Sequence, residues 1–385
     1  MSDWRVPGFT STGSKRPEAL FGSPARMTRA SGCRVWDDAD LEYVDYVMGL
    51  GAVALGYGHP AVNRAAEGAI AAGVVGPLPP VAEEELAEAL AQRIPWLERV
   101  RFLKTGAEAV AAAVRLARVA TGREEVLGCG YHGWLDWCQG ATEGVPAAVR
   151  GMFAELPFND VAAGLDLIRA RGSRLAAVVI EPVIVREPTR EWLQMLRAET
   201  ERAGAVLIFD EIKTAFRLAI GGAVERYGVS PAPDLVVIGK ALANGFPLAA
   251  VGGRADLMAG TSRTWISSTL ATEGVALAAA RATLEVFERE DVCGHLHRIG
   301  TQLLHGLHDL QRKHAGTISE VAGIAEMCFL HYATEEKAHA VALGAAKRGV
   351  LFKRTAYNFV SLAHDERTIS ETLNVLDQAL HDVAG

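Results

Sequence analysis

The sequence predicts an α/β fold with a mostly parallel sheet in one large domain and a smaller α+β domain beside it. Short apolar runs alternate with helical segments through the middle of the chain, which is typical of a parallel sheet covered on both faces. After about residue 291 the pattern changes to helices separated by short strands. At 385 residues, half of them hydrophobic, the chain is long enough to bury a substantial core.

The individual elements follow from apolar periodicity and from the breaks between segments. The first fifty residues indicate an irregular arm with short strands at 34–36 and 43–47, followed by helices at 59–73 and 82–93. In the middle we expect strands at 100–103, 125–129, 175–180, 206–209, 235–238 and 248–251, and helices at 108–120, 161–171, 191–203 and 273–289. Near the end we expect helices at 296–313, 335–348 and 368–383, and short strands at 324–331 and 359–362.

These elements predict three segments with different roles. Residues 1–58 form an N-terminal arm and part of the small domain, residues 59–290 form the large domain, and residues 291–385 form the C-terminal small domain.

Composition excludes several classes of function. The formal net charge is −7 and no long basic run is present, which argues against a nucleic-acid binder. The five cysteines are scattered without a Cys-x-x-Cys pair, so we expect reduced thiols and no metal site. The chain has no apolar leader at its start and no apolar stretch of about 18 residues, so we expect no membrane span and a cytoplasmic location.

Two acids stand at the carboxyl end of a buried strand. Asp210 and Glu211 follow the apolar run 206–209, and open α/β sheets place their ligand sites at this end of the strands. A helix cap or a surface turn is the competing interpretation.

A lysine stands at the end of the next apolar run. Lys240 follows the strand 235–238 and Gly239, among small residues. A lysine in such a confined place is partly desolvated, which favours the neutral nucleophilic amine. The alternative is a solvated lysine in a loop.

A third segment has the form of a phosphate-binding helix start. After the strand 100–103, the run Thr105-Gly106-Ala107-Glu108 opens a helix whose free backbone N–H groups can hold a phosphate. The glycine spacings of the Walker loop and of the dinucleotide fingerprint are both absent. An ordinary helix start is the alternative.

An aromatic pair follows the strand 125–129. Tyr131 and His132 lie between Gly130 and Gly133, so an aromatic ring could lie flat on a planar cofactor. A tyrosine in the core is the competing interpretation. A strand-end acid, a strand-end lysine, a phosphate-holding helix start and a stacking aromatic are together the parts that a pyridoxal phosphate site requires.

The order and wording of these segments resemble the class III (subgroup II) aminotransferases, and in particular their glutamate-1-semialdehyde aminomutase-like branch. The resemblance covers most of the chain. It is carried by Leu55-Gly56-Tyr57-Gly58-His59-Pro60, Thr105-Gly106-Ala107-Glu108, Tyr131-His132-Gly133, Glu181-Pro182, Phe209-Asp210-Glu211-Ile212, Gly239-Lys240 and Ser268-Thr269.

The resemblance implies a fold type I transferase with a seven-stranded sheet, pyridoxal 5′-phosphate as cofactor, and a role for each matched residue. Lys240 would be the Schiff-base lysine that also moves the substrate proton, and Asp210 would keep the cofactor's ring nitrogen protonated. The remaining cofactor contacts would be Gly106 and Ala107 at the phosphate, Tyr131 and Ile212 on the two ring faces, and His132 and Glu181 beside the ring. Thr269 would reach the cofactor phosphate of a neighbouring subunit, which implies a homodimer with shared active sites.

The chain departs from the family pattern near the expected substrate pocket. Val75 and Gly76 stand where the aminomutases have a serine beside an aromatic residue, which predicts a roomier and more apolar pocket. An acidic side chain expected near Tyr357 is missing, and Lys353 and Arg354 just upstream could hold an anionic group or be solvated charges.

The predicted function is transfer of an amino group from a small amine donor to an aldehyde or ketone, in secondary metabolism. An aminomutase or racemase using the same site remains open, and it would need no external donor. A binding protein that has lost catalysis is a further alternative, disfavoured because Lys240 and Asp210 are both present. A nicotinamide-dependent dehydrogenase is disfavoured because no Gly-x-Gly-x-x-Gly follows a strand.

Overall fold

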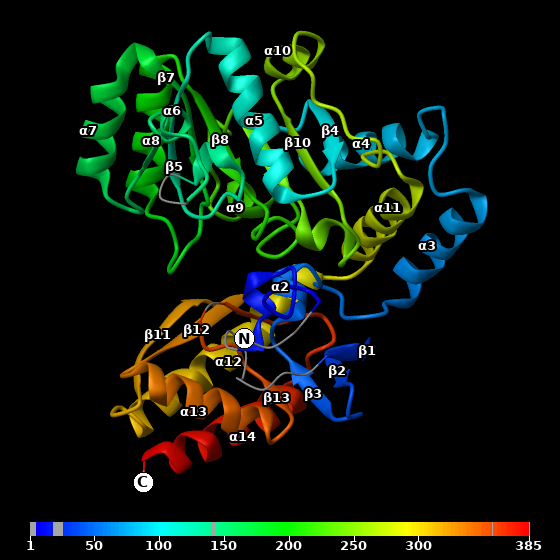
Figure 1. Ribbon diagram of the computed structural model, residues 1–385, viewed down its shortest axis with the longest axis vertical. Helices are drawn as coiled ribbons and strands as arrows, with labels where there is room; N and C mark the ends of the chain where they lie inside the picture. The colour runs from blue at the N-terminus through cyan, green and yellow to red at the C-terminus, as the bar shows by residue number, and fades with distance from the viewer. Residues whose placement is uncertain (1–4, 18–25, 140–142, 356, 385) are drawn as a thin grey trace. The chain divides into compact units, whose positions relative to one another are not determined.

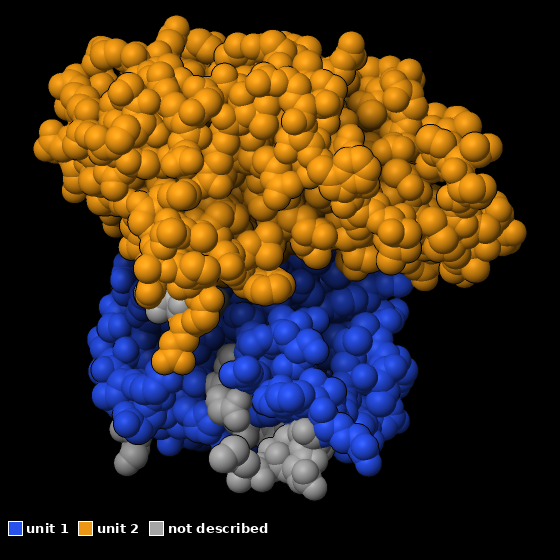
Figure 2. Space-filling model, turned by 45° about the horizontal axis from the view of Figure 1, so that its top comes forward, with its two compact units in different colours: residues 1–60, 291–385 blue, residues 61–290 orange. Residues whose placement is uncertain are grey.

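The computed structural model describes residues 5–17, 26–139, 143–355 and 357–384. The chain divides into two compact units, one of residues 61–290 and the other of residues 1–60 together with 291–385 (Figure 2). The larger unit contains a mixed sheet of seven strands, so the predicted α/β class is confirmed.

The seven-stranded sheet of the larger unit is parallel except for one strand (Figure 1). Strand β10 runs antiparallel to both of its neighbours, β4 and β9, while the other neighbouring pairs are parallel. In spatial order the strands are β4 (Arg99–Leu103), β10 (Ala249–Gly253), β9 (Leu235–Ile238), β8 (Val206–Asp210), β7 (Leu175–Ile180), β5 (Glu125–Cys129) and β6 (Phe153–Glu155).

Both faces of this sheet are buried, because neighbouring residues along each central strand pack into different cores. On β7, Ala177 and Val179 join the core beneath α5, whereas Val178 and Ile180 join the core beneath α7 and α8. This explains why the strands appear in the sequence as continuous apolar runs and not as alternating patterns. Helices α5 (Gly106–Thr121), α7 (Val161–Arg171) and α8 (Arg190–Ala203) supply the covering side chains.

The remaining elements of the larger unit connect the strands or lie beside the sheet. Helices α4 and α11 contact each other, and α11 also contacts the short 3₁₀ helix η4 that begins at Lys240. These elements are α3 (Pro60–Ala72), α4 (Val81–Arg93), α6 (Ala147–Arg150), α9 (Gly222–Arg226), η4 (Lys240–Ala243), α10 (Ala255–Met258) and α11 (Gly274–Arg289). No helix in the described part of the chain is both long and apolar enough to cross a membrane.

In the smaller unit, strands from the two ends of the chain form one sheet. Strand β13 (Val350–Leu351) pairs in parallel with β3 (Glu42–Asp45), which continues through β2 (Arg34–Asp37) to β1 (Met27–Ser31). A second sheet contains β11 (Ile318–Ile324), β12 (Met327–Tyr332) and β14 (Asn358–Phe359). The helices are α2 (Met48–Gly51), α12 (Val292–Lys313), α13 (Glu335–Ala346) and α14 (Glu366–Ala384).

Two strand predictions in this unit are wrong. The segment 324–331 is not one strand: Ile324 ends β11, and the chain turns at Ala325 and Glu326 before β12 begins. The turn was not predicted because it contains no glycine, proline or asparagine. The strand expected at 359–362 is limited to β14, because the backbone N–H of Leu362 donates to the carbonyl of Ala54 outside the sheet.

Candidate active site

The residues singled out by sequence meet at one edge of the large sheet. Asp210 ends β8, Glu181 follows β7 directly, and Lys240 lies two residues after β9. Because these three strands are parallel neighbours, their carboxyl ends lie side by side. This edge is where open α/β sheets bind their ligands.

Lys240 combines an unusual backbone with an unengaged amine. Its φ angle of 45° lies in the left-handed region, which a side chain with a Cβ seldom adopts and which is concentrated at functional sites. Burial lowers the pKa of Lys240 to about 8, with a further lowering from the positive charge of Lys213. No hydrogen bond or ion pair from the described residues engages its amine. The amine is therefore available as a nucleophile near neutral pH.

The two other lysines close to these motifs are already paired. The Nζ of Lys104 lies 2.7 Å from an oxygen of Glu273, and the Nζ of Lys213 lies 3.0 Å from an oxygen of Glu181. These ion pairs distinguish Lys240 from Lys104 and Lys213, since a lysine held by a carboxylate stays charged and is a poor nucleophile.

Asp210 is buried and held in place by a histidine. Its Oδ2 lies 2.8 Å from Nδ1 of His132, and its Oδ1 accepts a hydrogen bond of 3.2 Å from the backbone N–H of Ile212. Both side chains are at most 3% exposed. The other ring nitrogen of His132, Nε2, is buried and has no partner among the described residues. A buried polar atom of this kind is expected where a ligand completes the site.

The start of α5 presents unused backbone donors. Thr105 and Glu108 form a capping box: the Thr105 hydroxyl accepts from the N–H of Glu108, and the Glu108 carboxylate accepts from the N–H of Thr105. The N–H groups of Gly106 and Ala107 remain without a hydrogen-bond acceptor among residues that the structure describes. At the positive end of a 16-residue helix, these two groups can bind a phosphate.

Ile212 packs between Gly106 at the start of α5 and Gly239, which precedes Lys240. A Cβ added to Gly106 would lie 3.0 Å from Cδ1 of Ile212, and a Cβ added to Gly239 would lie 2.8 Å from the same atom. The two glycines are therefore needed for close packing around Ile212. Ile212 itself is partly exposed, so its apolar side chain lies between the start of α5 and the segment of Lys240 and is accessible to a ligand.

The loop after β5 is fixed by Glu181. The carboxylate of Glu181 accepts a hydrogen bond of 2.9 Å from the backbone N–H of Tyr131, and a Cβ added to Gly130 would lie 2.5 Å from the same oxygen. A Cβ on Gly133 would collide with Ala107 in the first turn of α5. Tyr131 itself is 66% exposed. Its side chain is therefore free to cover a ligand bound at this edge.

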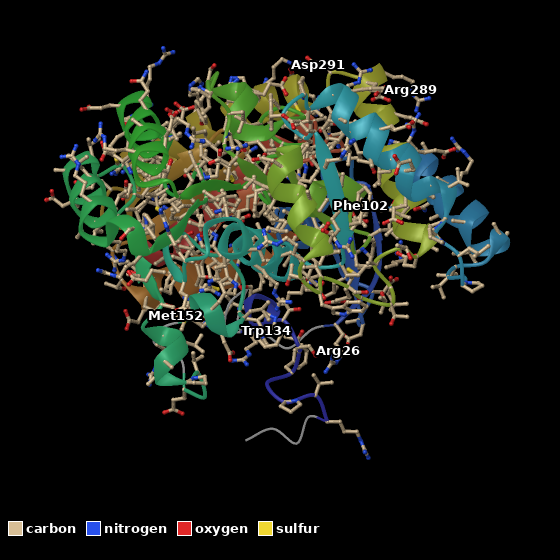
Figure 3. The ribbon with its side chains drawn as sticks, turned by 90° about the horizontal axis from the view of Figure 1, so that it is seen from above. Arg26, Phe102, Trp134, Met152, Arg289 and Asp291 are labelled. Carbon is tan, nitrogen blue, oxygen red and sulfur yellow. The ribbon has the colours of Figure 1, made fainter. Side chains whose placement is uncertain are left out.

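The same loop carries a second large aromatic side chain, Trp134, which is labelled in Figure 3. Trp134 is 74% exposed, whereas Phe102 on β4, labelled in the same view, is 3% exposed. Tyr131 and Trp134 are thus two large aromatic side chains on one loop that face solvent in the chain described here.

Three buried polar residues of the run after β8 had no role predicted from the sequence. They are Glu211, Thr214 and Arg217. Glu211 accepts hydrogen bonds from the backbone N–H groups of Ala223 (2.8 Å) and Val224 (3.0 Å) and from the Thr214 hydroxyl. Burial raises the pKa of Glu211 to about 7. Arg217, from the same run, is fully buried. Their position within a few residues of Asp210 was the signal available in the sequence.

Thr269, Val75 and Gly76 lie in two segments that contact each other. The backbone N–H of Gly274 donates a hydrogen bond of 2.7 Å to the carbonyl of Val74, which links the two segments. Thr269 is exposed, Val75 is 50% exposed, and a Cβ added to Gly76 would meet nothing within 4 Å. Within the described ranges, no hydrogen bond or ion pair joins these residues to Lys240 or Asp210.

Lys353 and Arg354 belong to the smaller unit, and both are largely buried. Burial lowers the pKa of Lys353, and its backbone N–H donates to the Asn358 side chain at 2.6 Å. Arg354 forms an ion pair with Glu335. The two side chains are therefore not simply solvated, and their role in substrate binding stays a prediction.

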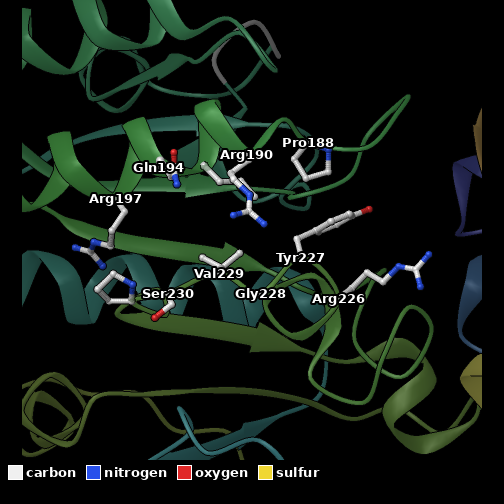
Figure 4. Close-up of a pocket in the computed structure, with 11 residues that line it drawn as sticks. Pro188, Arg190, Gln194, Arg197, Arg226, Tyr227, Gly228, Val229 and Ser230 are labelled. Atoms are coloured by element: carbon white, nitrogen blue, oxygen red, sulfur yellow. The ribbon is translucent and has the colours of Figure 1, made fainter.

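A separate pocket of about 510 Å³ lies between α8 and the loop after α9 (Figure 4). Arg190 reaches into it from α8, Arg197 at its rim pairs with Asp234 at 3.1 Å, and Arg226 and Tyr227 belong to the opposite segment. None of the residues assigned above lines this pocket. It is therefore not the place where Lys240 would act.

The sheet edge fits the cofactor that the sequence resemblance implies. The free N–H groups of Gly106 and Ala107 suit a phosphate, Ile212 offers an apolar surface for a flat ring, and the buried pair of His132 and Asp210 suits a ring nitrogen. The buried Nε2 of His132 is left without a partner among the described atoms, as expected for a site completed by another molecule.

Known proteins resemble the whole chain. The sequence pattern of the class III aminotransferases matches residues 21–380. The FumI protein of Sphingopyxis sp. MTA144, solved with PLP, has 26% sequence identity to this chain and a TM-score of 0.92. The match covers 99% of this chain and 94% of the FumI chain. An omega-transaminase from Sphaerobacter thermophilus is 29% identical with a TM-score of 0.86, over 94% and 92%.

A glutamate-1-semialdehyde aminomutase from Pseudomonas aeruginosa PAO1 has the same fold. It is 24% identical with a TM-score of 0.83, over 95% of this chain and 90% of that one. At this identity the likeness supports the fold alone, so it does not favour mutase over transaminase chemistry. With the family pattern covering nearly every residue, the chain belongs to the class III aminotransferases, which are pyridoxal-phosphate-dependent enzymes.

Proposed function

We propose that this aminotransferase moves an amino group from a small amine donor to an aldehyde or ketone with a largely apolar body, with Lys240 and Asp210 as its catalytic pair. The observation that carries the proposal is the unengaged amine of Lys240 beside the buried Asp210 and His132 pair, at the sheet edge that also presents Gly106 and Ala107.

Each residue has a defined task in this proposal. Bound pyridoxal phosphate supplies a conjugated ring that withdraws electrons from the amine-bearing carbon of the substrate. Lys240 would hold the cofactor covalently and would carry a proton between the substrate and the cofactor. Asp210 would keep a proton on the ring nitrogen, and His132 orients Asp210. Gly106 and Ala107 would bind the phosphate, while Ile212 and Tyr131 would enclose the ring and limit access of water.

Lys240→Ala tests the lysine assignment. Purified wild-type protein should absorb visible light when loaded with pyridoxal phosphate, and borohydride should then fix the cofactor to Lys240, as identified by peptide mass spectrometry. The variant should bind the cofactor without the covalent link. Attachment to Lys213 or Lys104 in the wild type would refute the assignment.

The substrate proposal rests on the segment around Val75. Val75 is half-exposed and Gly76 has open space where a side chain would stand, which supports a wide apolar pocket near this segment. We infer a cyclic or secondary-metabolite carbonyl compound as acceptor, in place of the charged substrate of the tetrapyrrole aminomutase. Lys353 or Arg354 would contact an anionic group if the donor carries one.

Half-reaction spectroscopy tests both donor and acceptor. Each productive amine should convert the lysine-bound cofactor to its amine form, with loss of the visible band, and each productive carbonyl compound should restore the band. Efficient formation of 5-aminolevulinate from glutamate 1-semialdehyde without added donor would instead establish the aminomutase alternative.

We further propose a homodimer in which each active site uses both chains. Exposed large apolar side chains concentrate in the segments around Val75 and Thr269, which supports a partner surface there. They are Ile70, Val74, Val75, Leu78, Val81, Trp265 and Leu270.

In this proposal residues 59–290 are the cofactor-binding domain, residues 1–58 are the N-terminal arm and part of the small domain, and 291–385 form its C-terminal part. The five free cysteines are compatible with a cytoplasmic location.

A further inference from the structure

Lys213 and Glu181 form a nearly buried ion pair at the sheet edge. Their side chains are 10% and 7% exposed, and the Nζ of Lys213 lies 3.0 Å from Oε1 of Glu181. The second carboxylate oxygen of Glu181 accepts the backbone N–H of Tyr131 at 2.9 Å. One carboxylate therefore joins the segment after β8 to the loop after β5.

A buried ion pair needs a reason other than stability. Removing two charges from water costs about as much free energy as their attraction returns, so apolar side chains could fill this space equally well. The plain interpretation is that the pair only fastens two segments together. Fastening, however, requires only a hydrogen bond to the Tyr131 backbone, which a neutral glutamine could provide.

The neighbourhood of the pair gives the charges a purpose. The charged groups that act on Lys240 come from three elements: Glu181 after β7, Asp210 at the end of β8, and Lys213 and Arg217 in the run that follows β8. Glu211, at the same strand end, is fixed by Ala223, Val224 and Thr214. From α11, which packs on η4, Glu273 is neutralised by Lys104.

We propose that Lys213 is a positioning residue of this active site: its ammonium group, anchored by Glu181, keeps the amine of Lys240 in the neutral form, while Glu181 holds the Tyr131 loop in place. This inference rests on the proposed role of Lys240. It assigns Lys213 no contact with the substrate and no part in moving a proton.

The charges of the pair act on Lys240 in opposite directions. After burial, the positive charge of Lys213 is the largest influence that lowers the pKa of Lys240, whereas Glu181 and Asp210 raise it. Replacing Lys213 by a neutral residue removes the positive charge that opposes Glu181, so the pKa of Lys240 should rise. Replacing Glu181 by glutamine removes a negative charge, so the pKa of Lys240 should fall.

Competitive labelling of the cofactor-free protein measures this directly. Acetic anhydride reacts only with a neutral amine, so the extent of Lys240 labelling against pH, read by peptide mass spectrometry, gives the pKa without any catalytic turnover. The wild-type midpoint should lie near pH 8. Lys213→Met should raise it by about one pH unit, and Glu181→Gln should lower it.

Two further variants separate electrostatics from structural damage. Lys213→Arg keeps the charge and should leave the midpoint near the wild-type value. The double variant Lys213→Met with Glu181→Gln should return toward that value, because the positive and the negative charge of the pair are removed together. General loosening of the site would instead move both single variants in the same direction, toward the pKa of an exposed lysine. If Lys213→Met does not fold, the downward shift in Glu181→Gln still decides.

The proposal is overturned if Lys213→Met leaves the midpoint unchanged, or if both single variants shift it upward. These results are independent of the proposed function, which fails separately if borohydride fixes the cofactor to a lysine other than Lys240. A further readout is the rate at which pyridoxal phosphate forms its covalent link at pH 7, which should fall about tenfold in Lys213→Met if the midpoint rises by one unit.

Discussion

The carboxylate of Asp210 is held at both of its oxygens by different parts of the larger unit, one by His132 and the other by the backbone of Ile212. A buried acid fixed in this manner has little freedom to rotate, and its charge faces whatever ring nitrogen binds beside it. Its contribution should therefore be to the reaction more than to cofactor binding.

Asp210→Asn should lower kcat by about 10²-fold or more, because a neutral amide cannot hold a proton on the ring nitrogen. Cofactor affinity, measured by fluorescence titration of the cofactor-free protein, should change much less. A variant with wild-type turnover would contradict the role given to Asp210. His132→Asn provides a milder comparison, since it loses the orienting contact but keeps the acid.

Glu211 should make stability depend on pH. Its pKa is raised from an ordinary value of 4.5 to about 7 by burial, so the folded protein binds this proton more tightly than the unfolded chain. The associated stability is fully present below about pH 4.5 and is lost as pH rises toward 7, a change of about 3 kcal/mol.

The comparison of wild type with Glu211→Gln isolates this effect. Between pH 4.5 and 7, the Tm of the wild type should fall relative to that of Glu211→Gln as pH rises, because only the wild type carries the titrating group. A difference that stays constant over this range would show that the pKa of Glu211 is not raised. Other carboxylates titrate in both proteins and cancel in the comparison.

Sequence reasoning at the residue scale reached Lys240 and Asp210 but not the Lys213 and Glu181 pair. Lys240 and Asp210 each follow an apolar run in their own segment, so local pattern was enough. The ion pair joins residues from two different strand ends, and its formation depends on side-chain directions that no local pattern encodes. The role of each site residue stays a prediction until the variants are measured.

At the scale of elements, one ion pair links the end of β4 to the start of α11. Glu273 caps α11 by accepting from the N–H groups of Val275 and Ala276, and its carboxylate also pairs with Lys104 at the end of β4. Both charged side chains are only about one-eighth exposed, at 13% and 12%. The segment Thr105-Gly106-Ala107, which opens α5, begins directly after Lys104, so this pair helps to fix it.

Glu273→Ala should lower the free energy of unfolding by about 3 kcal/mol, since it removes a cap and leaves the charge of Lys104 uncompensated. Glu273→Gln keeps the cap and should cost less. As a matched control on the same helix, Glu285→Ala removes an exposed pair with Arg281 and should change stability by under about 0.5 kcal/mol. Equal losses for all three, measured by urea denaturation, would refute this account.

Strands buried on both faces were predictable, whereas exposed or sharply turned ones were not. The expected limits of 125–129, 175–180 and 235–238 agree with β5, β7 and β9, since these runs are apolar apart from Glu125 at the start of β5. Strand β1 was not predicted because it is mostly exposed and carries no apolar alternation. The hairpin of β11 and β12 turns at Ala325 and Glu326, which are not typical turn residues, so the sequence pattern did not separate the two strands.

At the scale of the whole molecule, the proposed dimer makes a prediction about mixed protomers. Lys240→Ala lacks the lysine and Thr269→Ala lacks the hydroxyl proposed to reach the neighbouring site. Unfolding and refolding the two variants together should recover about a quarter of wild-type activity, because half the dimers are mixed and each carries one intact site. Each variant refolded alone serves as control.

Activity of the mixture equal to the average of the two controls would contradict shared sites. Size-exclusion chromatography with light scattering should show a dimer at the concentrations used. A monomer with full activity would refute the role given to Thr269 in a partner's site.

The tight glycine contacts around Ile212 divide the site into positions that can evolve and positions that cannot. A Cβ at Gly106, Gly130 or Gly239 would enter space already filled by Ile212 or Glu181, so a saturation library there should yield few soluble clones. Gly76 has no such neighbour, and Tyr131 projects into solvent. Directed evolution toward new carbonyl acceptors should therefore accumulate its beneficial substitutions at residues 75, 76 and 131, and deep sequencing of selected clones would show whether it does.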